Sequence, residues 1–166
     1  FSEKVIDPKN ERADNPAKLM TANYPLLVRD ALVKTLNIDP ANRAEVKQAT
    51  DMVSASARTQ LRDIVVANPS VIGTTQTVSL LAEGNIDSAN KGQIDLTVAE
   101  ANRKVKDKQI EWMNTLSESG SLTKSFNTGL FTYGASSRPE AAGIGVAALG
   151  SLYMMLIVLV LALPIG

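Results

Sequence analysis

The sequence of 166 residues contains neither cysteine nor histidine. Without cysteine the chain has no disulfide and no thiolate nucleophile, and its redox compartment is left undetermined. The two absences together remove the commonest zinc ligands, the Ser-His and Cys-His nucleophile pairs, and pH switching by imidazole. We therefore expect a protein that is not an enzyme, with no catalytic residue, no metal site and no cofactor.

The chain also lacks an excess of either charge, because its 17 basic and 17 acidic residues give no net charge. Nucleic-acid binding draws its affinity from a surplus of Lys and Arg. The most basic run, residues 103–108 (RKVKDK), is interrupted by Asp107 and flanked by Glu100 and Glu111. This pattern favours a solvated helix face, and we expect no nucleic-acid partner.

No charged residue occurs in residues 141–166 (AAGIGVAALGSLYMMLIVLVLALPIG). A helix needs about 20 mostly apolar residues to cross a hydrocarbon core of about 30 Å, and a charge at its centre costs at least about 2.5 kcal/mol. The alternative, a buried core helix, would need more apolar surroundings than the polar remainder of the chain can supply. The segment therefore predicts a transmembrane helix that contacts membrane lipid.

The two ends of this segment differ. Its first turns consist mostly of small residues, as expected where membrane helices approach closely, although Gly143 and Gly150 could equally lie in a loop outside the bilayer. Pro164 is tolerated in a membrane helix when neighbouring structure satisfies the freed carbonyl group. Because no basic residue follows the segment to anchor it, we expect the sequence to be a fragment with more membrane sequence beyond it.

The residues before the apolar segment predict a helix-dominated α+β domain. Apolar residues at spacings of three and four predict helices over residues 23–36, 54–67 and 99–117. Asp39 is expected to cap a weaker helix from Pro40 to Thr50. In the helix over 99–117, the residues expected to face inward are Val105, Ile110, Met113 and Leu116, with Trp112 at the edge.

Two segments suggest strands. Polar and apolar residues alternate over residues 73–81, which predicts a short strand, and residues 122–132 could form another. Residues 1–6 could be a strand or a juxtamembrane segment. Residues 7–16 are rich in Pro, Asn, Asp and charge, and they predict a loop.

Three groups of residues are weak candidates for chemistry. Gly73-Thr-Thr could receive an anion on its backbone amides, although it lacks a Walker-type Lys and a plain turn is the simpler interpretation. Arg29-Asp30 and Arg62-Asp63 are adjacent charges on predicted helices, and we expect each to find an ion-pair partner elsewhere. Asp87, Asp95 and Glu100 could bind a hard cation, but their spacing is not that of a calcium loop.

Several runs, taken in order, resemble the permease subunit of the phosphate-specific ABC transporter (PstA type), in the version with an extended extracytoplasmic region. The resemblance starts at about Ala22, and its specificity lies in the order of the runs. The matching runs are ANYPLLVRDAL (22–32), LRDIVVANPSVIG (61–73), KGQID (91–95), Phe126-Asn127, Phe131-Thr132, Gly134, Pro139-Glu140, Ala142-Gly-Ile144, Gly150-Ser-Leu and Leu163-Pro-Ile-Gly166.

The resemblance implies a role in phosphate transport without catalysis. It implies an extracytoplasmic soluble domain, residues 1–138, and the start of the permease membrane core, residues 139–166, in a multi-pass protein of the bacterial inner (plasma) membrane. The implied partners are a second permease subunit, an ATP-binding subunit and a periplasmic phosphate-binding protein. Residues 1–138 would then lie on the periplasmic side. No functional residue of the family carries over to this sequence.

Two other interpretations stay open. The alternative from a different class is a single-span membrane-anchored interaction or sensor domain, although a tail anchor would normally carry basic residues beside its span, where only Arg138 lies close. An enzyme that uses a Ser/Lys dyad is the third, and no motif in the sequence places such a dyad.

Overall fold

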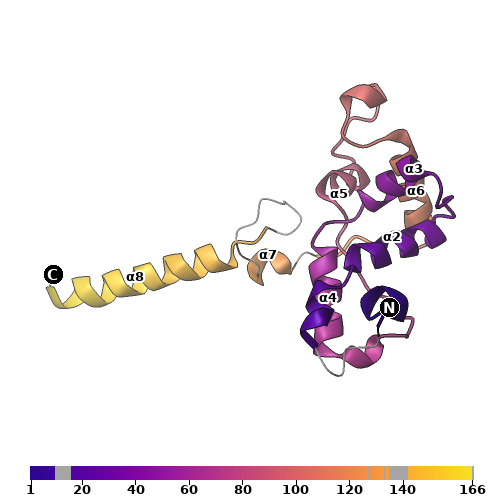
Figure 1. Ribbon diagram of the computed structural model, residues 1–166. Coiled ribbons are helices and arrows are strands. Elements are labelled where there is room, and N and C mark those ends of the chain that lie inside the picture. Colours follow the sequence, from indigo (N-terminus) through magenta and orange to yellow (C-terminus); the bar gives the residue numbers. More distant parts are fainter. Residues whose placement is uncertain (10–15, 127, 133, 135–141, 166) are drawn as a thin grey trace. The chain divides into compact units, whose positions relative to one another are not determined.

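The computed structural model describes residues 1–9, 16–126, 128–132, 134 and 142–165, and within these ranges every regular element is helical. The helices divide between two compact units, Phe1–Leu122 and Thr123–Gly166 (Figure 1). The helix-dominated part of the predicted fold is confirmed, whereas its β component is not. The predicted domain boundary at residues 138 and 139 lies outside the described residues.

The first unit contains nearly all the short helices. Its α-helices are α1 (Glu3–Ile6), α2 (Tyr24–Thr35), α3 (Arg43–Thr50), α4 (Ala57–Ala67), α5 (Gly84–Asn90) and α6 (Asp107–Glu118), and its 3-10 helices are η1 (Pro16–Thr21), η2 (Pro69–Val71) and η3 (Glu100–Asn102). The second unit contains α7 (Gly129–Thr132) and the long helix α8 (Gly145–Ile165).

Helices α2 and α4 confirm the predictions over residues 23–36 and 54–67. The side chain of Asn23 caps α2 by accepting a hydrogen bond from Leu26 N at 3.3 Å, and Pro25 occupies the first turn, where its missing N–H costs nothing. Helix α4 ends at Ala67, and the next residue, Asn68, has a non-helical backbone and precedes Pro69. These ends follow from local chemistry that the sequence displays.

The predicted helix from Pro40 is shorter than expected, and the predicted cap is wrong. Asp39 accepts a hydrogen bond from Ala41 N at 2.9 Å, which forms a turn rather than a helix start. Asn42 caps α3 instead by accepting from Glu45 N at 3.3 Å. Both Asp and Asn are good helix caps, and here the second of the two candidates begins the helix.

Helix α6 begins at Asp107, so the predicted start at residue 99 is wrong. Residues 100–102 form the separate turn η3, and the side chain of Gln109 accepts a hydrogen bond from Lys106 N at 3.0 Å at the true start. Gly120, with φ of 72°, follows the end of α6 in the left-handed region that favours glycine. Trp112 is only 5% exposed, which corrects its predicted place at the edge of the core.

Two buried apolar clusters hold the first unit together. The first cluster joins α1, η1, α2, α4 and η2, and its buried members are Ile6, Leu19, Tyr24, Val28, Ala57, Leu61, Val65, Val71 and Ile72. The second joins α3, α5 and α6, and its buried members are Ile38, Ala49, Met52, Ile86, Ala89, Val105, Trp112 and Met113. Ile110 and Leu116 pack against the second cluster, which confirms the inward face predicted for this region.

The predicted strands do not form among the described residues. Residues 74–81 have no regular structure, and the neighbouring Ala82 makes one isolated bridge with Val53. Val78 and Leu80 pack against the first cluster, so the alternation of polar and apolar residues reflects the partial burial of an irregular segment and not a strand. Residues 1–6 contain the helix α1, and the region over 122–132 contains the helix α7, so these strand predictions are wrong.

Candidate functional site

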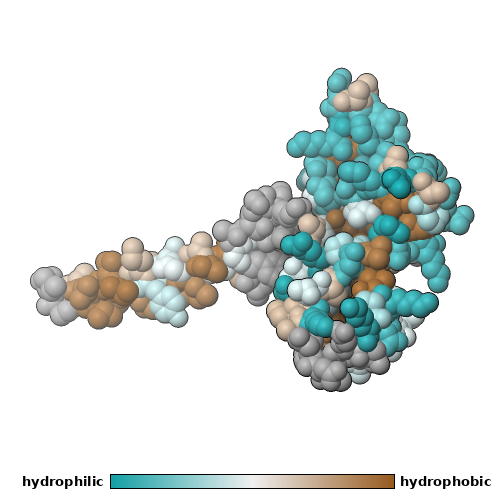
Figure 2. All heavy atoms as spheres, in the orientation of Figure 1, coloured by the Kyte–Doolittle hydropathy of each residue, from teal (hydrophilic) through white to brown (hydrophobic). Residues whose placement is uncertain are grey.

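Helix α8 is the part of the described chain whose composition is farthest from that of a water-soluble protein. Residues Gly145–Leu163 are 19 residues without a charge. Gly145 is buried, whereas every residue from Val146 to Leu163 is exposed. At about 1.5 Å per residue they span about 28 Å, close to the hydrocarbon thickness of about 30 Å. Figure 2 shows this helix with a predominantly hydrophobic surface. The helix is therefore long and apolar enough to cross a membrane.

The apolar surface of α8 runs around its whole circumference. Its polar side chains over residues 145–163 are Ser151 and Tyr153. These residues are two positions apart, so on a helix they point in nearly opposite directions. A helix that is apolar on all sides is found buried in a protein core or in lipid, and not exposed to water. Helix α8 thus offers no polar stripe along which an ion could move.

The short helix α7 is attached to the beginning of α8. Leu130 O accepts a hydrogen bond from Ile144 N at 2.8 Å, and Gly134 O accepts one from Gly143 N at 3.0 Å. The backbone bonds fix α7 beside the first turn of the apolar helix. Phe126 and Phe131 bring their rings together nearby, with centroids 6.1 Å apart and planes inclined by 24°.

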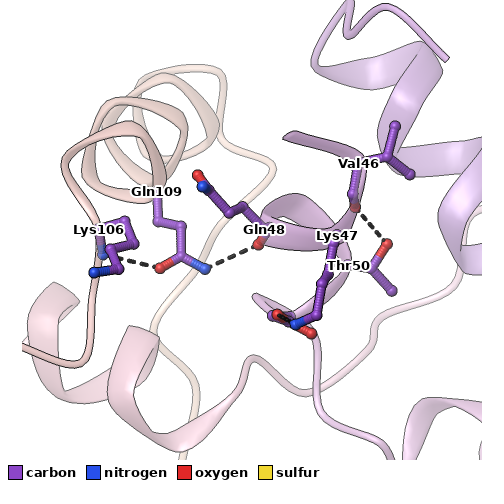
Figure 3. A network of polar contacts seen from close by, with 7 residues as sticks. Val46, Lys47, Gln48, Thr50, Lys106 and Gln109 are labelled. Carbon is purple, nitrogen blue, oxygen red and sulfur yellow. Dashed lines mark hydrogen bonds and ion pairs between the residues drawn. The ribbon is translucent and has the colours of Figure 1, made fainter. Parts of the chain in front are cut away.

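A buried amide connects α6 with α3 in the first unit. Gln109 Nε2 donates to Gln48 O at 2.9 Å, while Gln109 Oε1 accepts from Lys106 N (Figure 3). The bond to Gln48 links residues that are 61 positions apart in the sequence. Sequence analysis missed this contact, because it treated residue 109 as an ordinary polar position. Spacing offers the missing signal, since Gln109 lies four residues from both Val105 and Met113, which are buried.

Replacing Gln109 by Ala is expected to lower the free energy of unfolding by about 1–3 kcal/mol, because the carbonyl of Gln48 loses its buried donor. Guanidinium unfolding of the full chain in detergent micelles, followed by circular dichroism, measures the change. Gln48→Ala is the matched control, since it keeps the carbonyl that accepts the bond and should change stability by less than about 0.5 kcal/mol. Equal stability of the two variants would contradict this role.

Tyr24 supplies a second buried polar contact, in the first cluster. Its hydroxyl donates to Leu19 O at 2.5 Å and thereby connects α2 with η1. Burial raises the pKa of Tyr24 above its ordinary value of 10.0, although Arg62 acts in the opposite direction. The hydroxyl therefore stays protonated, and remains a donor, throughout the physiological pH range.

The candidate anion site at Gly73 is already used by the chain itself. Gly73 N donates to Phe1 O at 2.8 Å, and Thr74 O accepts from Phe1 N at 2.7 Å. The hydroxyl of Thr74 donates to Val71 O at 2.7 Å. Gly73 has a φ of 84°, so this segment is a glycine turn, the simpler of the two interpretations given above.

The Arg-Asp pairs are on exposed helix faces, but each Arg pairs with its own neighbour. Arg29 Nε lies 3.2 Å from Asp30 Oδ1, and Arg62 Nη2 lies 2.7 Å from Asp63 Oδ1. The expectation that each would find its partner elsewhere is wrong, because the long Arg side chain can fold along the helix surface to the adjacent carboxylate. Exposed pairs of this kind add little stability.

Two of the three candidate cation ligands, Asp87 and Asp95, have separate partners. Asp87 pairs with Lys91 at 2.5 Å. Asp95 accepts from the backbone and hydroxyl of Thr97, and these bonds hold the pKa of Asp95 below its usual range. The structure groups no three His, Cys, Asp or Glu side chains into a metal site within the residues that it describes.

Two of the four basic residues in the run 103–108 pair with acidic neighbours. Arg103 pairs with Asp107 and donates to Leu96 O at 3.1 Å. Lys108 pairs with Glu111 at 2.9 Å, and that bond raises the pKa of Lys108. The predicted solvated helix face is wrong for Arg103, because its side chain is only 8% exposed and it lies before the start of α6.

A family model described as a domain of unknown function (DUF3333) matches residues 1–100. The match covers more than half of the chain and includes α1 to α5 of the first unit. Neither any curated protein nor any solved structure matches the chain.

Proposed function

The chain belongs to the DUF3333 family, and on that premise we propose that it is part of the membrane permease subunit of a phosphate-specific ABC importer. The observation that carries the proposal is the charge-free helix α8, which follows a polar helical unit. Phosphate is named as the substrate because the sequence runs between Ala22 and Gly166 resemble that permease in their order. The permease would contribute to the translocation unit for inorganic phosphate and perform no chemistry of its own.

Within such a permease, α8 would serve as a packing helix. A phosphate ion sheds water only where hydrogen-bond donors or cations replace it, and α8 offers only Ser151 and Tyr153 over residues 145–163. Polar groups for the pathway would therefore come from other helices and from the second permease subunit. The small residues Gly145, Ala147 and Gly150 near its start allow neighbouring helices to approach closely.

The proposal places residues 1–138 on the periplasmic side of a multi-pass protein in the bacterial inner membrane. There the first unit would meet the periplasmic phosphate-binding protein, which delivers the ion. An ATP-binding subunit on the opposite side would supply the energy. Because other proteins would deliver the ion and supply the energy, the first unit would need no binding site of its own. Its polar side chains form caps, turns and surface pairs.

Deletion of the gene in the source organism tests the proposal. We expect uptake of radiolabelled phosphate from low external concentrations to be lost, and an intact plasmid copy to restore it. Sulfate uptake, measured in the same cells, is the control and should be unchanged. Phosphate uptake equal to that of the parent strain would overturn the proposal.

A single-span membrane-anchored interaction or sensor domain is the second candidate. The observation that favours it is that α8 is the one helix long and apolar enough to cross a membrane in the described part of the chain. Copurification separates the two candidates. A permease subunit extracted in mild detergent should bring its ATP-binding subunit with it, whereas a single-span sensor should not.

A further inference from the structure

An exposed apolar surface surrounds the short helix α7. Phe126 is 75% exposed, Phe131 58% and Leu130 40%, and these three residues are called the α7 surface. The two Phe rings stack on each other and leave their outer faces uncovered. Large apolar side chains that gather on a surface mark a contact with another molecule or with a membrane.

The α7 surface lies beside the first turn of the apolar helix α8. The bond from Ile144 N to Leu130 O fixes α7 at the beginning of α8, and Ile144 and Val146 are themselves exposed apolar residues. A Cβ atom built on Gly134 would lie 3.6 Å from Val146 Cγ2, so the chain segment after α7 also packs against the first turn of α8. The first turn of α8 and the α7 surface therefore meet the same surroundings.

The residues beside the α7 surface suit a boundary between lipid and water. Residues 125–132 (SFNTGLFT) carry no charge, and their polar groups are small hydroxyls and one amide. Exposed Lys124 precedes them, and a Lys side chain can extend its amine toward lipid phosphate while its stem lies on apolar groups. Short segments with an apolar face and a polar face lie in the headgroup region of membranes, with the apolar face about 5–10 Å deep.

We propose that the α7 surface contacts the interfacial region of the same lipid bilayer that α8 crosses, so that α7 lies along the membrane surface. The occupant of this apolar surface is lipid, because the bond from Ile144 to Leu130 places it beside the exposed apolar residues Ile144 and Val146 at the start of α8. The inference rests on the insertion of α8, which is one part of the proposed function, and does not depend on phosphate as the substrate.

Spin labels test the depth of α7 directly, because the chain has no cysteine that would compete for the label. Three single variants of the full chain, Leu130→Cys, Val158→Cys and Lys34→Cys, are labelled and reconstituted in phosphatidylethanolamine–phosphatidylglycerol vesicles. Oxygen concentrates in lipid and a nickel chelate concentrates in water, so the ratio of their collision rates with the label reports depth. We expect the highest ratio at residue 158, an intermediate ratio at residue 130 and the lowest at residue 34.

A second pair of variants tests the aromatic rings themselves. In the Leu130→Cys chain, the double change Phe126→Ser and Phe131→Ser should shift the ratio at residue 130 several-fold toward that at residue 34. The matched control, Ser125→Ala with Thr128→Ala, alters the same segment but keeps both rings, and should leave the ratio unchanged.

Each result bears on a different statement. A deep label at residue 158 with an aqueous label at residue 130 would overturn the inference and leave the insertion of α8 standing. A label at residue 130 that neither reagent reaches would also overturn it, because another protein surface or a second copy would then cover α7. Aqueous labels at both residues would overturn the inference together with the insertion of α8. A lipid-exposed label at residue 130 with an aqueous label at residue 158 would contradict the insertion of α8 and overturn the inference as stated, because α7 would then contact a bilayer that α8 does not cross.

Discussion

Two lysines in the middle of α8, Met155→Lys with Val158→Lys, are expected to move the protein out of the membrane fraction. Each charge at the centre of a spanning helix costs about 2.5–3.5 kcal/mol, so the pair raises the free energy of insertion by about 5–7 kcal/mol. The two positions are three residues apart and share a face of the helix, so the lysines also repel each other. The fraction of the full chain that resists alkaline carbonate extraction measures the effect.

The matched control keeps both positions apolar. Met155→Leu with Val158→Leu alters the same side chains without adding charge, and its membrane fraction should equal that of the parent chain. If the lysine variant stayed in the membrane to the same extent as this control, the spanning role of α8 would be wrong. The first unit contributes nothing to this difference, because both variants leave it untouched.

Trp112→Ala is expected to have the largest effect on the stability of the first unit. Removing a buried Trp side chain costs about 3–5 kcal/mol, because the apolar contacts are lost and a cavity remains. Trp112 belongs to the second buried cluster and also lies beneath Lys108 Nζ, which is 5.7 Å from the ring centroid. A domain is usually stable by only about 5–15 kcal/mol, so this loss is a large share of the total.

Guanidinium unfolding of the full chain in micelles, followed by circular dichroism, measures this loss. Glu111→Ala is the control on the same helix, because the Glu111 side chain is exposed and its ion pair with Lys108 is worth at most about 1 kcal/mol. Similar midpoints for the two variants would show that Trp112 is not part of the core.

Apolar spacing and turn residues predict α2, α4 and α8 from the sequence. These helices carry their own evidence, since Asn23 and Pro25 mark the start of α2, and Asn68-Pro69 marks the end of α4. Helix α8 needs only its lack of charge. In each case the deciding interactions lie within one or two helical turns, and they can be read without knowledge of distant residues.

The failed predictions depend on partners that are far away in the sequence. Residues 74–81 have the alternation of a strand, but a strand also needs a neighbour, and Ala82 finds only the single residue Val53. The periodicity from residue 99 suggested one long helix, but Gln109 accepts a bond from Lys106 N and also reaches Gln48, which sets the start of α6. Sequence alone does not reveal which distant segment will meet such groups.

One part of the candidate site, α8, could be predicted from the sequence, and the other part, the α7 surface, could not. The lack of charge in α8 was sufficient to predict its suitability for a membrane. The α7 surface could not be predicted, because Phe126, Leu130 and Phe131 are apolar residues that a sequence assigns to a core by default. The backbone bond from Ile144 to Leu130 places α7 beside the first turn of α8, and the three side chains are exposed there.

The arrangement of the two clusters has a consequence for the order of folding during synthesis. All buried members of the first cluster lie between Ile6 and Ile72, whereas the second needs residues from Ile38 to Met113. Domains fold from the N-terminus as the chain emerges, and longer loops cost more entropy to close. The first cluster can therefore form while α6 is still inside the ribosome, and α3 must wait with part of its apolar face uncovered until Trp112 and Met113 arrive.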